Sequence, residues 1–206
     1  MGHLAGRYIA FEGGEGAGKS TQARRLARRV DAVVTREPGG TELGEKLRQL
    51  LLEPGQAPIG ARAETLLMAA DRAQHFDEVV LPTLQSGRHV VSDRTAFSSL
   101  AYQGGGRELG IDDVRAVNEF AMRGRWPDAV VLLEVPPIVA RDRLGRRLDR
   151  MEQEAVGFHE RVAATFDLLA ETDRSSRWHR IVATGTIDDV TEAVWSAVAD
   201  LFPQAR

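Results

Sequence analysis

Residues 8–22 read Tyr8-Ile-Ala-Phe-Glu-Gly-Gly-Glu-Gly-Ala-Gly-Lys-Ser-Thr-Gln22, an apolar run followed by a glycine-rich segment. Within this stretch, Gly13 to Ser20 fit the phosphate-loop pattern G-x-x-x-x-G-K-[ST]. The apolar run before the loop is typical of a buried strand, and apolar residues at helical spacing follow it as far as Val30. A phosphate loop between a strand and a helix predicts that the chain binds a nucleoside triphosphate.

The chemistry of this loop suits an anion. Its glycines let the backbone turn several N–H groups towards one point, and the helix that opens at Gly18 adds the positive end of its dipole. Lys19 has the reach to contact the outer phosphates, and Ser20 offers a hydroxyl to magnesium. The alternative is a glycine-rich turn that binds nothing, which the Lys-Ser pair argues against. We expect the triphosphate to be bound by Gly13, Gly14, Glu15, Gly16, Ala17, Gly18, Lys19, Ser20 and Thr21.

The composition is that of an ordinary soluble protein, with 206 residues, a net charge of −3 and no cysteine. The length predicts a single domain across residues 1–206. The small net charge gives no global attraction to nucleic acid or membrane, and no apolar run reaches the ~20 residues that span a bilayer. Because the sequence shows neither cysteines nor a hydrophobic leader, we expect a cytoplasmic protein.

Apolar strands alternate with helical stretches along the chain. This pattern predicts an α/β fold of three layers, with a parallel sheet covered by helices on both faces. The expected strands are residues 8–12, 32–36, 89–92, 129–135 and 180–184. The expected helices are residues 18–30, 41–52, 61–86, 111–124, 136–147, 151–172 and 188–201. The glycines at residues 104–106 are expected to form a flexible turn.

Polar side chains gather where strands of this sheet end, and ligands of such sheets bind beyond the carboxyl ends of the strands. Arg36 and Glu37 end one strand, and they are either substrate-binding groups or the solvated charges of a capped turn. Asp93 ends another strand, at the position that holds the magnesium shell in phosphate-loop proteins. The adjacent Arg94 can grip a phosphate with two hydrogen bonds. The alternative is that Asp93 caps a helix and Arg94 lies on the surface.

Further polar groups lie on predicted helices. Arg72 borders the apolar stripe of helix 61–86, with Met68 one turn before it on the same flank. Arg72 either pairs with Asp71 or Glu78 nearby, or points into a cleft of which Met68 forms an apolar wall. Beyond Arg94, two pairs of hydrogen-bonding residues are four apart and suit a base or a sugar: Ser98 with Tyr102, and Ser99 with Gln103.

Five arginines occupy the ten residues from 141 to 150, interleaved with Asp142 and Asp149. Such a run is usually the solvated face of a helix. Its place after the fourth strand would also let it fold over the triphosphate, so we expect a small lid near residues 141–153. Arginines in this lid would neutralise charge as the γ-phosphoryl group moves, which is worth roughly 10³–10⁵ in rate where an arginine finger acts.

Together these motifs resemble those of the bacterial thymidylate kinase family. The phosphate loop is shared by many functions, whereas the Arg-Glu-Pro-Gly-Gly-Thr and Ala-Asp-Arg-Ala-Gln-His stretches are far more specific. The matching stretches keep the family's order over residues 8 to about 170 and are Phe11-Glu-Gly-Gly-Glu-Gly-Ala-Gly-Lys-Ser-Thr-Gln22, Thr35-Arg-Glu-Pro-Gly-Gly-Thr41, Ala69-Ala-Asp-Arg-Ala-Gln-His75, Ser92-Asp-Arg94, Ala101-Tyr-Gln-Gly-Gly-Gly-Arg107 and Leu148-Asp-Arg-Met-Glu-Gln-Glu154.

The resemblance implies a phosphate-loop kinase that uses Mg²⁺ to transfer the γ-phosphoryl group of ATP to dTMP, giving dTDP and ADP. It also implies a five-stranded parallel sheet and a homodimer, for which the face of helix 61–86 away from the sheet is a candidate interface. Neither nucleic acid nor a membrane is an expected partner.

The resemblance also suggests roles for single residues. Arg72 and Arg94 look like the grips on the phosphate of the acceptor, Ser20 and Asp93 hold the metal, and Ser99 and Gln103 lie near the thymine edge. Glu15 would reach toward the acceptor sugar, and Tyr102 would lie against the deoxyribose and disfavour a 2′-hydroxyl. The expected acceptor site is Glu15, Arg36, Met68, Arg72, Arg94, Ser99, Tyr102 and Gln103. The expected catalytic residues are Lys19, Asp93, Arg94, Arg143, Arg147 and Arg150.

Two branches of this family differ in where an arginine comes from. One carries it in the phosphate loop at the position of Gly16, and the other supplies it from the lid. The bare Gly16 and the arginine-rich lid resemble the second branch, with Arg143, Arg147 and Arg150 as candidates. The chain departs from the family in having Met68 where an aromatic residue is common, which predicts a looser grip on thymine, and Thr95 in place of a tyrosine.

Two other functions remain open from the residues alone. A kinase of a hydroxyl acceptor, such as a deoxynucleoside or shikimate, would need a carboxylate base, and Glu12 or Glu37 would serve. A phosphate-loop switch or ATPase would bind a partner protein through ordered switch loops and hydrolyse ATP without an acceptor. The sequence shows no such switch loops.

Overall fold

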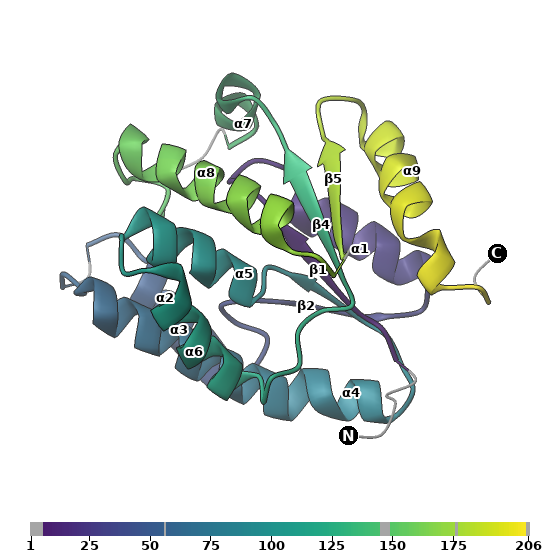
Figure 1. The fold of residues 1–206 in the computed structure, drawn as a ribbon, viewed down its shortest axis with the longest axis horizontal. Coiled ribbons are helices and arrows are strands. Elements are labelled where there is room, and N and C mark those ends of the chain that lie inside the picture. The colour runs from purple at the N-terminus through teal and green to yellow at the C-terminus, as the bar shows by residue number, and fades with distance from the viewer. Residues whose placement is uncertain (1–5, 56, 145–148, 176, 205–206) are drawn as a thin grey trace.

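The computed structural model describes residues 6–55, 57–144, 149–175 and 177–204. Its centre is a sheet of five parallel strands in the order β2-β3-β1-β4-β5, which confirms the predicted architecture (Figure 1). The strands are β1 (Tyr8–Glu12), β2 (Val33–Arg36), β3 (Val90–Asp93), β4 (Ala129–Glu134) and β5 (Trp178–Val182). Because β1 is the central strand, the phosphate loop that follows it emerges in the middle of the sheet's carboxyl edge.

Helices connect the strands. They are α1 (Lys19–Arg29), α2 (Glu42–Leu52), α3 (Ala61–His75), α4 (Leu81–Gln85), α5 (Ala96–Ser99), α6 (Ile111–Ala121), α7 (Pro137–Leu144), α8 (Val156–Thr172) and α9 (Ile187–Val198). The π-helical segments η1 (Phe76–Val80) and η2 (Leu100–Gly106) and the 3₁₀ turn η3 (Ala199–Leu201) complete the elements. In the described part of the chain, no helix is both long enough and apolar enough to cross a bilayer.

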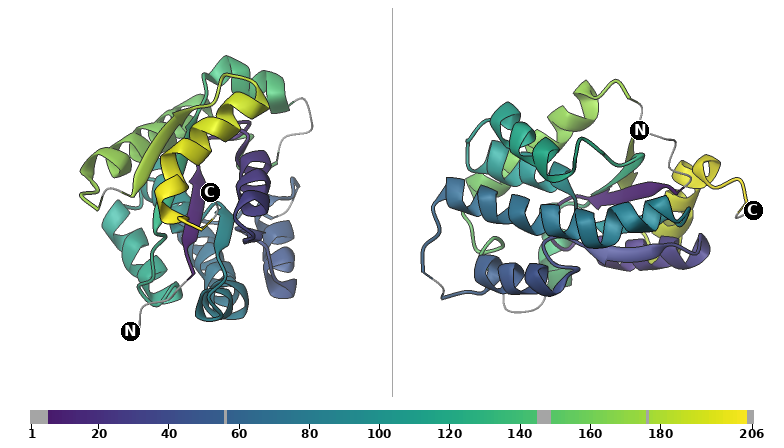
Figure 2. Two further views of the ribbon diagram at one scale, coloured as in Figure 1. Left: turned by 90° about the vertical axis from the view of Figure 1, so that its right-hand side faces the viewer. Right: turned by 90° about the horizontal axis from the view of Figure 1, so that it is seen from below.

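The alternation of side chains along the central strands divides the core between two faces of the sheet. Ile9 and Phe11 of β1 pack with apolar residues of α1 and α9 on one face. Ala10 of β1 and Val130 of β4 pack with residues of α5, η2, α6 and α8 on the other face. The sheet is therefore buried on both sides, which explains its continuous apolar strands and gives the three layers seen in Figures 1 and 2.

Several predicted boundaries shift. The helix expected over residues 61–86 stays helical from Ala61 to Gln85, but the π-helical segment η1 interrupts it between α3 and α4. The last strand begins two residues earlier than predicted, at Trp178 instead of residue 180. The helix expected from residue 151 begins only at Val156, because Asp149 Oδ1 accepts hydrogen bonds of 2.9 Å from the N–H groups of both Met151 and Glu152 and holds a turn.

The prediction of a flexible turn at residues 104–106 is wrong. These glycines lie within η2, where the main chain packs closely against α8. A Cβ atom on Gly105 would lie 1.9 Å from Thr165 Oγ1, and one on Gly106 would lie 2.6 Å from Phe158 Cε2. The glycines thus serve close packing between two helical segments, which a sequence pattern cannot distinguish from a turn.

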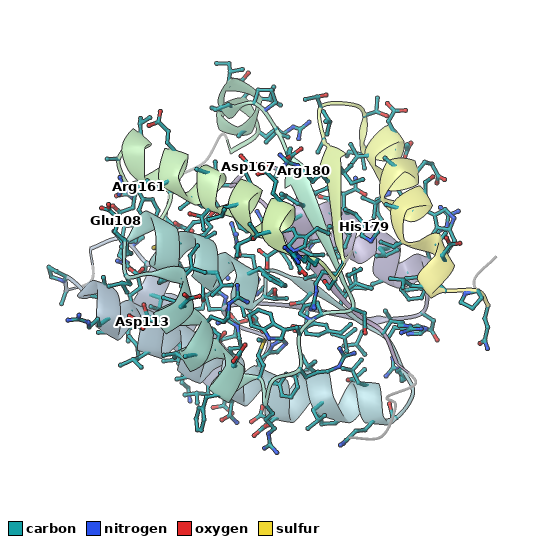
Figure 3. The ribbon with its side chains drawn as sticks, in the orientation of Figure 1. Glu108, Asp113, Arg161, Asp167, His179 and Arg180 are labelled. Atoms are coloured by element: carbon teal, nitrogen blue, oxygen red, sulfur yellow. The ribbon has the colours of Figure 1, made fainter. Side chains whose placement is uncertain are left out.

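Ion pairs tie the edge strand β5 to its neighbours. Arg180 Nε lies 2.8 Å from Glu134 Oε1 of β4, and Arg180 Nη2 lies 2.6 Å from Asp167 Oδ1 of α8 (Figure 3). All three side chains are partly exposed, so each pair contributes little to stability. The pairing of β5 with β4 along the parallel ladder from Trp178 to Val182, rather than these surface charges, holds this end of the sheet.

Candidate active site

The phosphate loop spans Gly13 to Ser20 and joins β1 to α1. Gly13 has a φ of +130°, and a Cβ there would lie 2.3 Å from the carbonyl oxygen of Leu133, so only glycine fits. Gly18 caps α1 with a φ of 92°, and the first N–H groups of that helix are available to an anion. Lys19 Nζ donates to Gly14 O at 2.7 Å and closes the loop on itself. Burial and the nearby Arg94 lower the pKa of Lys19.

Ser20 and Asp93, the predicted magnesium ligands, are brought together. Ser20 Oγ donates to Asp93 Oδ2, because β3 lies next to β1 and its last residue reaches the start of α1. A hydroxyl and a carboxylate are oxygen ligands of the kind that Mg²⁺ takes together with water and substrate phosphates. Over the described residues no group of three or more His, Cys, Asp or Glu could hold a metal by itself. A metal at Ser20 and Asp93 would therefore take further ligands from a phosphate substrate.

A cleft of about 290 Å³ opens beside the phosphate loop at the carboxyl edge of the sheet. Most of the predicted site residues line it, namely Glu15, Gly16, Gly18, Lys19, Ser20, Thr21, Arg36, Met68, Arg72, Asp93, Arg94, Ser99, Tyr102 and Gln103. Gly13, Gly14 and Ala17 belong to the loop but do not line the cleft. The cleft thus joins a triphosphate-binding loop to a wall of hydrogen-bonding side chains that come from α3, α5 and η2.

Arg94 is held rigidly between the loop and that wall. It follows β3 with a φ of +71°, and its guanidinium donates to Gly13 O at 3.2 Å, Ser98 Oγ at 2.9 Å and Tyr102 Oη at 3.1 Å. It also forms an ion pair with Glu15. Burial alone would raise the pKa of Glu15, but Arg94, Lys19 and the hydrogen bond from Tyr102 together outweigh burial and lower the pKa to about 2. Burial alone would lower the pKa of Arg94, but Glu15 together with the other acidic groups around it outweighs burial and raises the pKa, so both groups stay charged.

Arg72 lines the same cleft with different partners. Its Nε donates to Glu37 Oε2 at 2.7 Å, its Nη1 donates to Ser99 Oγ at 3.0 Å, and it also donates to Asn118 Oδ1. The other oxygen of Glu37 lies 2.9 Å from His75 Nδ1. With 2% of its surface exposed, Arg72 is a buried cation whose charge is balanced by Glu37. Balanced in this way, it presents hydrogen-bond donors rather than a free positive charge.

Neither Asp71 nor Glu78, the partners suggested by sequence proximity, pairs with Arg72, because the fold brings Glu37 closer. Asp71 Oδ1 instead accepts a hydrogen bond of 2.8 Å from Gly39 N. Its Oδ2 is buried without a hydrogen-bond partner within the part of the chain that the structure describes. Burial, reinforced by the charge of Glu37, raises the pKa of Asp71 to about 7.

Glu12 is not accessible to a substrate. It is fully buried, its Oε1 accepts from Thr95 N at 2.8 Å and Thr95 Oγ1 at 2.7 Å, and its Oε2 accepts from Ser98 Oγ at 2.5 Å. Burial raises the pKa of Glu12. Glu37 lines the cleft, but both of its oxygens already accept hydrogen bonds from α3. Neither carboxylate considered as a general base therefore offers a free oxygen to a substrate hydroxyl.

Sequence reasoning missed some residues of the cleft. Arg48 of α2 lines it and donates from Nη1 to Pro38 O at 2.8 Å, and burial together with Arg36 lowers the pKa of Arg48. In the sequence it looks like any solvated arginine of an amphipathic helix. Glu37 and Ser98, each named above as one of several possible binding groups, also line the cleft. The other lining residues without a predicted binding role are Pro38, Leu52, Asp149 and Met151. The last two lie in the Leu-Asp-Arg-Met-Glu-Gln-Glu stretch, which could have indicated them.

The described lid arginines do not reach the cleft. Arg143 Nη2 donates to the carbonyl oxygen of Ala183 at 2.9 Å, and Arg150 Nη2 lies 2.7 Å from Glu64 Oε2. Arg147 lies outside the described residues. Among the described residues, the structure therefore brings together the phosphate loop, the Ser20–Asp93 pair and the wall of hydrogen-bonding side chains, but not Arg143 or Arg150.

The backbone of α7 packs directly on the phosphate loop. Gly16 has a φ of +71°, and a Cβ atom on it would lie 2.5 Å from the carbonyl oxygen of Ala140 in α7. A side chain at this position would have to displace α7 or the loop.

Comparison with known proteins gives one family. The family model described as thymidylate kinase matches residues 11–194. A thymidylate kinase of Bifidobacterium longum subsp. infantis is 43% identical over 95% of this chain and 85% of its own length. A thymidylate kinase of Halothermothrix orenii is 45% identical over 83% of this chain and 87% of its own length.

A solved structure agrees with these relatives. The crystal structure of a thymidylate kinase from Ehrlichia chaffeensis aligns with a TM-score of 0.78 at 28% identity, over 94% of this chain and 98% of the other. The similarity in sequence and in fold thus extends over nearly the whole chain.

Proposed function

The chain belongs to the thymidylate kinase family, and from this premise we propose that it transfers the γ-phosphoryl group of ATP to dTMP, giving dTDP and ADP. The observation that carries this proposal is the single cleft lined both by the phosphate loop and by Arg94, Arg72 and Gln103. A donor nucleotide bound at the loop and an acceptor bound along the wall would meet beside Lys19 and Arg94.

The reaction needs positioning and charge compensation rather than a general base. The second pKa of a phosphate monoester is about 6, so the attacking oxygen of dTMP is already mostly anionic at pH 7. Bringing two anionic nucleotides together costs Coulomb energy, which Lys19 and Arg94 offset. The full occupation of Glu12 and Glu37 by hydrogen bonds fits this chemistry and argues against a hydroxyl acceptor.

We assign Arg94 and Arg72 to opposite ends of dTMP, the phosphate and the base. Arg94 contacts the phosphate loop and is assigned to the phosphate of the acceptor. Arg72, balanced by Glu37 and bonded to Ser99, is assigned to the base end, which departs from the pairing of both arginines with the phosphate that the resemblance suggested.

The remaining wall residues suit the sugar and the base. Tyr102 Oη donates to Glu15 Oε1 at 3.3 Å, and this pair is assigned to the deoxyribose. Met68 is assigned to one face of thymine, because its thioether packs favourably on a ring. Arg36 lines the cleft and is held by both oxygens of Glu45 at 2.8 and 2.9 Å, so it is assigned to the substrate as a hydrogen-bond donor rather than as a free charge.

Magnesium fits the pair Ser20 and Asp93, which would hold it through a hydroxyl and a carboxylate oxygen. Bound there, it would neutralise charge on the phosphates of ATP. The residues of this chain orient the nucleotides around it.

The lid is proposed to supply the arginine for the γ-phosphoryl group, as in the branch of the family with an arginine-rich lid. The support is Gly16, where the backbone of Ala140 occupies the space that a side chain would need. Arg143, Arg147 and Arg150 remain the candidates. To contact the γ-phosphate, Arg143 would have to give up its hydrogen bond to Ala183 O, and Arg150 its ion pair with Glu64.

A homodimer, and a location in the cytoplasm, are proposed from the family. The support for the dimer is a large exposed apolar residue on each of the adjacent helices α3 and α6. Leu66 of α3 is 60% exposed and Phe120 of α6 is 89% exposed. Large exposed apolar side chains on neighbouring helices favour a protein partner, and a second copy of this chain is the partner that the family suggests.

An acceptor screen tests the proposed function. The purified protein, with ATP and magnesium, is offered dTMP, the other nucleoside monophosphates, deoxynucleosides and shikimate, and the formation of ADP and of the phosphorylated product is measured. We expect transfer to dTMP to dominate. Transfer mainly to a hydroxyl acceptor, or hydrolysis of ATP at the same rate without an acceptor, would overturn the proposal.

A further inference from the structure

Glu64 is a buried carboxylate that contacts a cleft-lining residue, Gln103, without lining the cleft itself. It lies in the first turn of α3 with none of its surface exposed. Its Oε1 accepts from Gln103 Nε2 at 2.9 Å and Arg107 Nε at 3.2 Å, and its Oε2 accepts from Arg107 Nη2 at 3.1 Å and Arg150 Nη2 at 2.7 Å. Burial alone would raise the pKa of Glu64, but these hydrogen bonds outweigh burial and lower it, so the group is ionised at neutral pH.

This contact decides which way the amide of Gln103 points. An ionised carboxylate only accepts hydrogen bonds, and a guanidinium only donates them. The end of the amide that meets Glu64 must therefore be the NH₂ group, and the carbonyl oxygen must be at the other end. This orientation follows from the hydrogen-bonding chemistry of Glu64. It does not depend on how the similar amide oxygen and nitrogen of Gln103 were assigned.

The carbonyl oxygen of Gln103 is directed at the cleft. Across the described residues, Gln103 Oε1 makes no hydrogen bond, and the one fully buried side-chain polar atom that lacks a partner is Asp71 Oδ2. Because Gln103 lines the cleft, its Oε1 must reach the open space there. The wall consequently presents a hydrogen-bond acceptor at this point, beside Ser99 and the donors of Arg72.

An acceptor next to donors matches one kind of pyrimidine edge. Thymine carries an N3–H donor beside its O4 acceptor, whereas cytosine carries an N3 acceptor beside an amino donor. A fixed carbonyl oxygen would accept from N3–H of thymine and would meet the lone pair of N3 in cytosine. A bidentate match to the right base edge discriminates against the wrong one by about 1–3 kcal/mol.

We propose that Glu64 is a positioning residue that sets base specificity: it fixes the Gln103 amide with its oxygen in the cleft, and so favours an imide pyrimidine over an aminopyrimidine. This inference rests on the proposed function, because it concerns the acceptor of that reaction. Arg107 and Arg150 keep Glu64 ionised, and Arg107 is held in turn by Glu154 at 2.6 Å. If Glu64 were protonated, it could donate to Gln103, and the amide would be free to turn around.

The test compares kcat/KM for dTMP and dCMP in the full-length protein and in Glu64→Gln. In the variant the new amide keeps its oxygen for the arginines and offers NH₂ to Gln103, so Gln103 turns its own NH₂ to the cleft. We expect the ratio of kcat/KM for dTMP to that for dCMP to fall by roughly tenfold to a hundredfold. A ratio within twofold of the wild-type value, or equal losses for both acceptors, would overturn the inference.

Two further variants make the test specific. Glu154→Gln removes the other carboxylate on Arg107 without touching Gln103, and it should leave the ratio unchanged. The reciprocal exchange, Glu64→Gln with Gln103→Glu, keeps one negative charge beside the arginines and returns an acceptor oxygen to the cleft. We expect this double variant to restore the preference for dTMP. It can be measured even if Glu64→Gln alone does not fold. If the double variant folds and does not prefer dTMP, the inference is overturned.

The wild-type measurement separates this inference from the function on which it rests. If the wild-type protein does not phosphorylate dTMP, the proposed function fails whatever the variants do. If the wild-type protein prefers dTMP and Glu64→Gln keeps that preference, the proposed function is supported, but Glu64 does not set base specificity.

Discussion

Arg94 is the residue whose contacts best separate substrate positioning from nucleotide affinity. Its guanidinium donates to Ser98 and Tyr102 of the cleft wall. Its side-chain contacts with the phosphate loop are the long hydrogen bond of 3.2 Å to Gly13 O and the ion pair with Glu15, a residue assigned above to the acceptor sugar. We expect Arg94→Ala to lower kcat/KM for dTMP by roughly 10²–10³, as the loss of one preorganised donor does elsewhere. Its Kd for ATP should change little.

The measurement pairs steady-state kinetics with calorimetric binding of ATP. Arg123→Ala is a matched control, because Arg123 pairs with Asp77 on the surface and does not line the cleft. Comparable losses in turnover and in ATP affinity for Arg94→Ala would contradict the assignment of Arg94 to the acceptor.

Asp71 predicts a pH dependence of stability. Its pKa is about 7 in the folded protein against about 4 in the unfolded chain, so the folded state binds the proton more tightly between these values. The free energy of unfolding should therefore fall as the pH rises from about 4 to about 7, by at most about 4 kcal/mol. The nearby charges that act on this carboxyl are Glu37, which raises its pKa, and Arg72 and His75, which lower it.

Asp71→Asn isolates this effect. The amide keeps an oxygen for Gly39 N but does not titrate. Urea unfolding at pH 5 and pH 8 should show the variant gaining stability relative to the wild type at the higher pH. An equal difference at both values would mean that Asp71 does not titrate in this range.

At the scale of elements, the contact between η2 and α8 depends on glycine. A Cβ atom on Gly105 would meet Thr165 Oγ1 at 1.9 Å and Thr165 Cβ at 2.8 Å. Gly105→Ala should force the two segments apart and lower the free energy of unfolding by about 1–3 kcal/mol, as overpacking does in other cores.

Denaturant unfolding, with the m-value checked, measures this loss. Gly60→Ala is the control, because a Cβ atom there meets nothing within 4 Å and the φ of −65° suits alanine. A Gly105→Ala protein as stable as Gly60→Ala would show that η2 and α8 can separate freely.

At the scale of the whole molecule, the exposed Leu66 of α3 and Phe120 of α6 lead us to expect association of two copies. Phe120→Asp places a charge where the dimer would bury an aromatic ring, so we expect a monomer by light scattering at concentrations where the wild type is dimeric. The control is Val182→Asp, which changes an apolar residue 68% exposed on the edge strand β5.

Dimers of Phe120→Asp as stable as those of the wild type would place the interface elsewhere. A wild-type protein that is monomeric at all concentrations would remove the dimer altogether. The cleft is lined by residues of one copy, so its binding of ATP is expected to survive the loss of the dimer.

Most of the fold could be predicted because its signals are local. A buried parallel strand reads as a short apolar run, and a phosphate loop is a contiguous pattern from Gly13 to Ser20. The positions of Asp93 and Arg94 could be predicted because Asp93 ends such a strand and Arg94 follows it. The glycines of η2 could not, since close packing against α8 depends on a residue about 60 positions further along, and glycine itself signals a turn equally well.

The sequence alone determined the α/β class, the position of the phosphate loop and most of the polar residues that line the cleft, because each of these depends on adjacent residues or on one period of a helix. Only the tertiary structure decided which of these residues are free to act. In the folded protein Arg72 pairs with Glu37 instead of Asp71, and Thr95 and Ser98 donate hydrogen bonds that occupy both oxygens of Glu12. The Gln103 amide donates its NH₂ group to Glu64. The physical reason is that hydrogen bonds and ion pairs depend on distances of about 3 Å, and residues far apart in the chain reach these distances only after the sheet has brought its strand ends together.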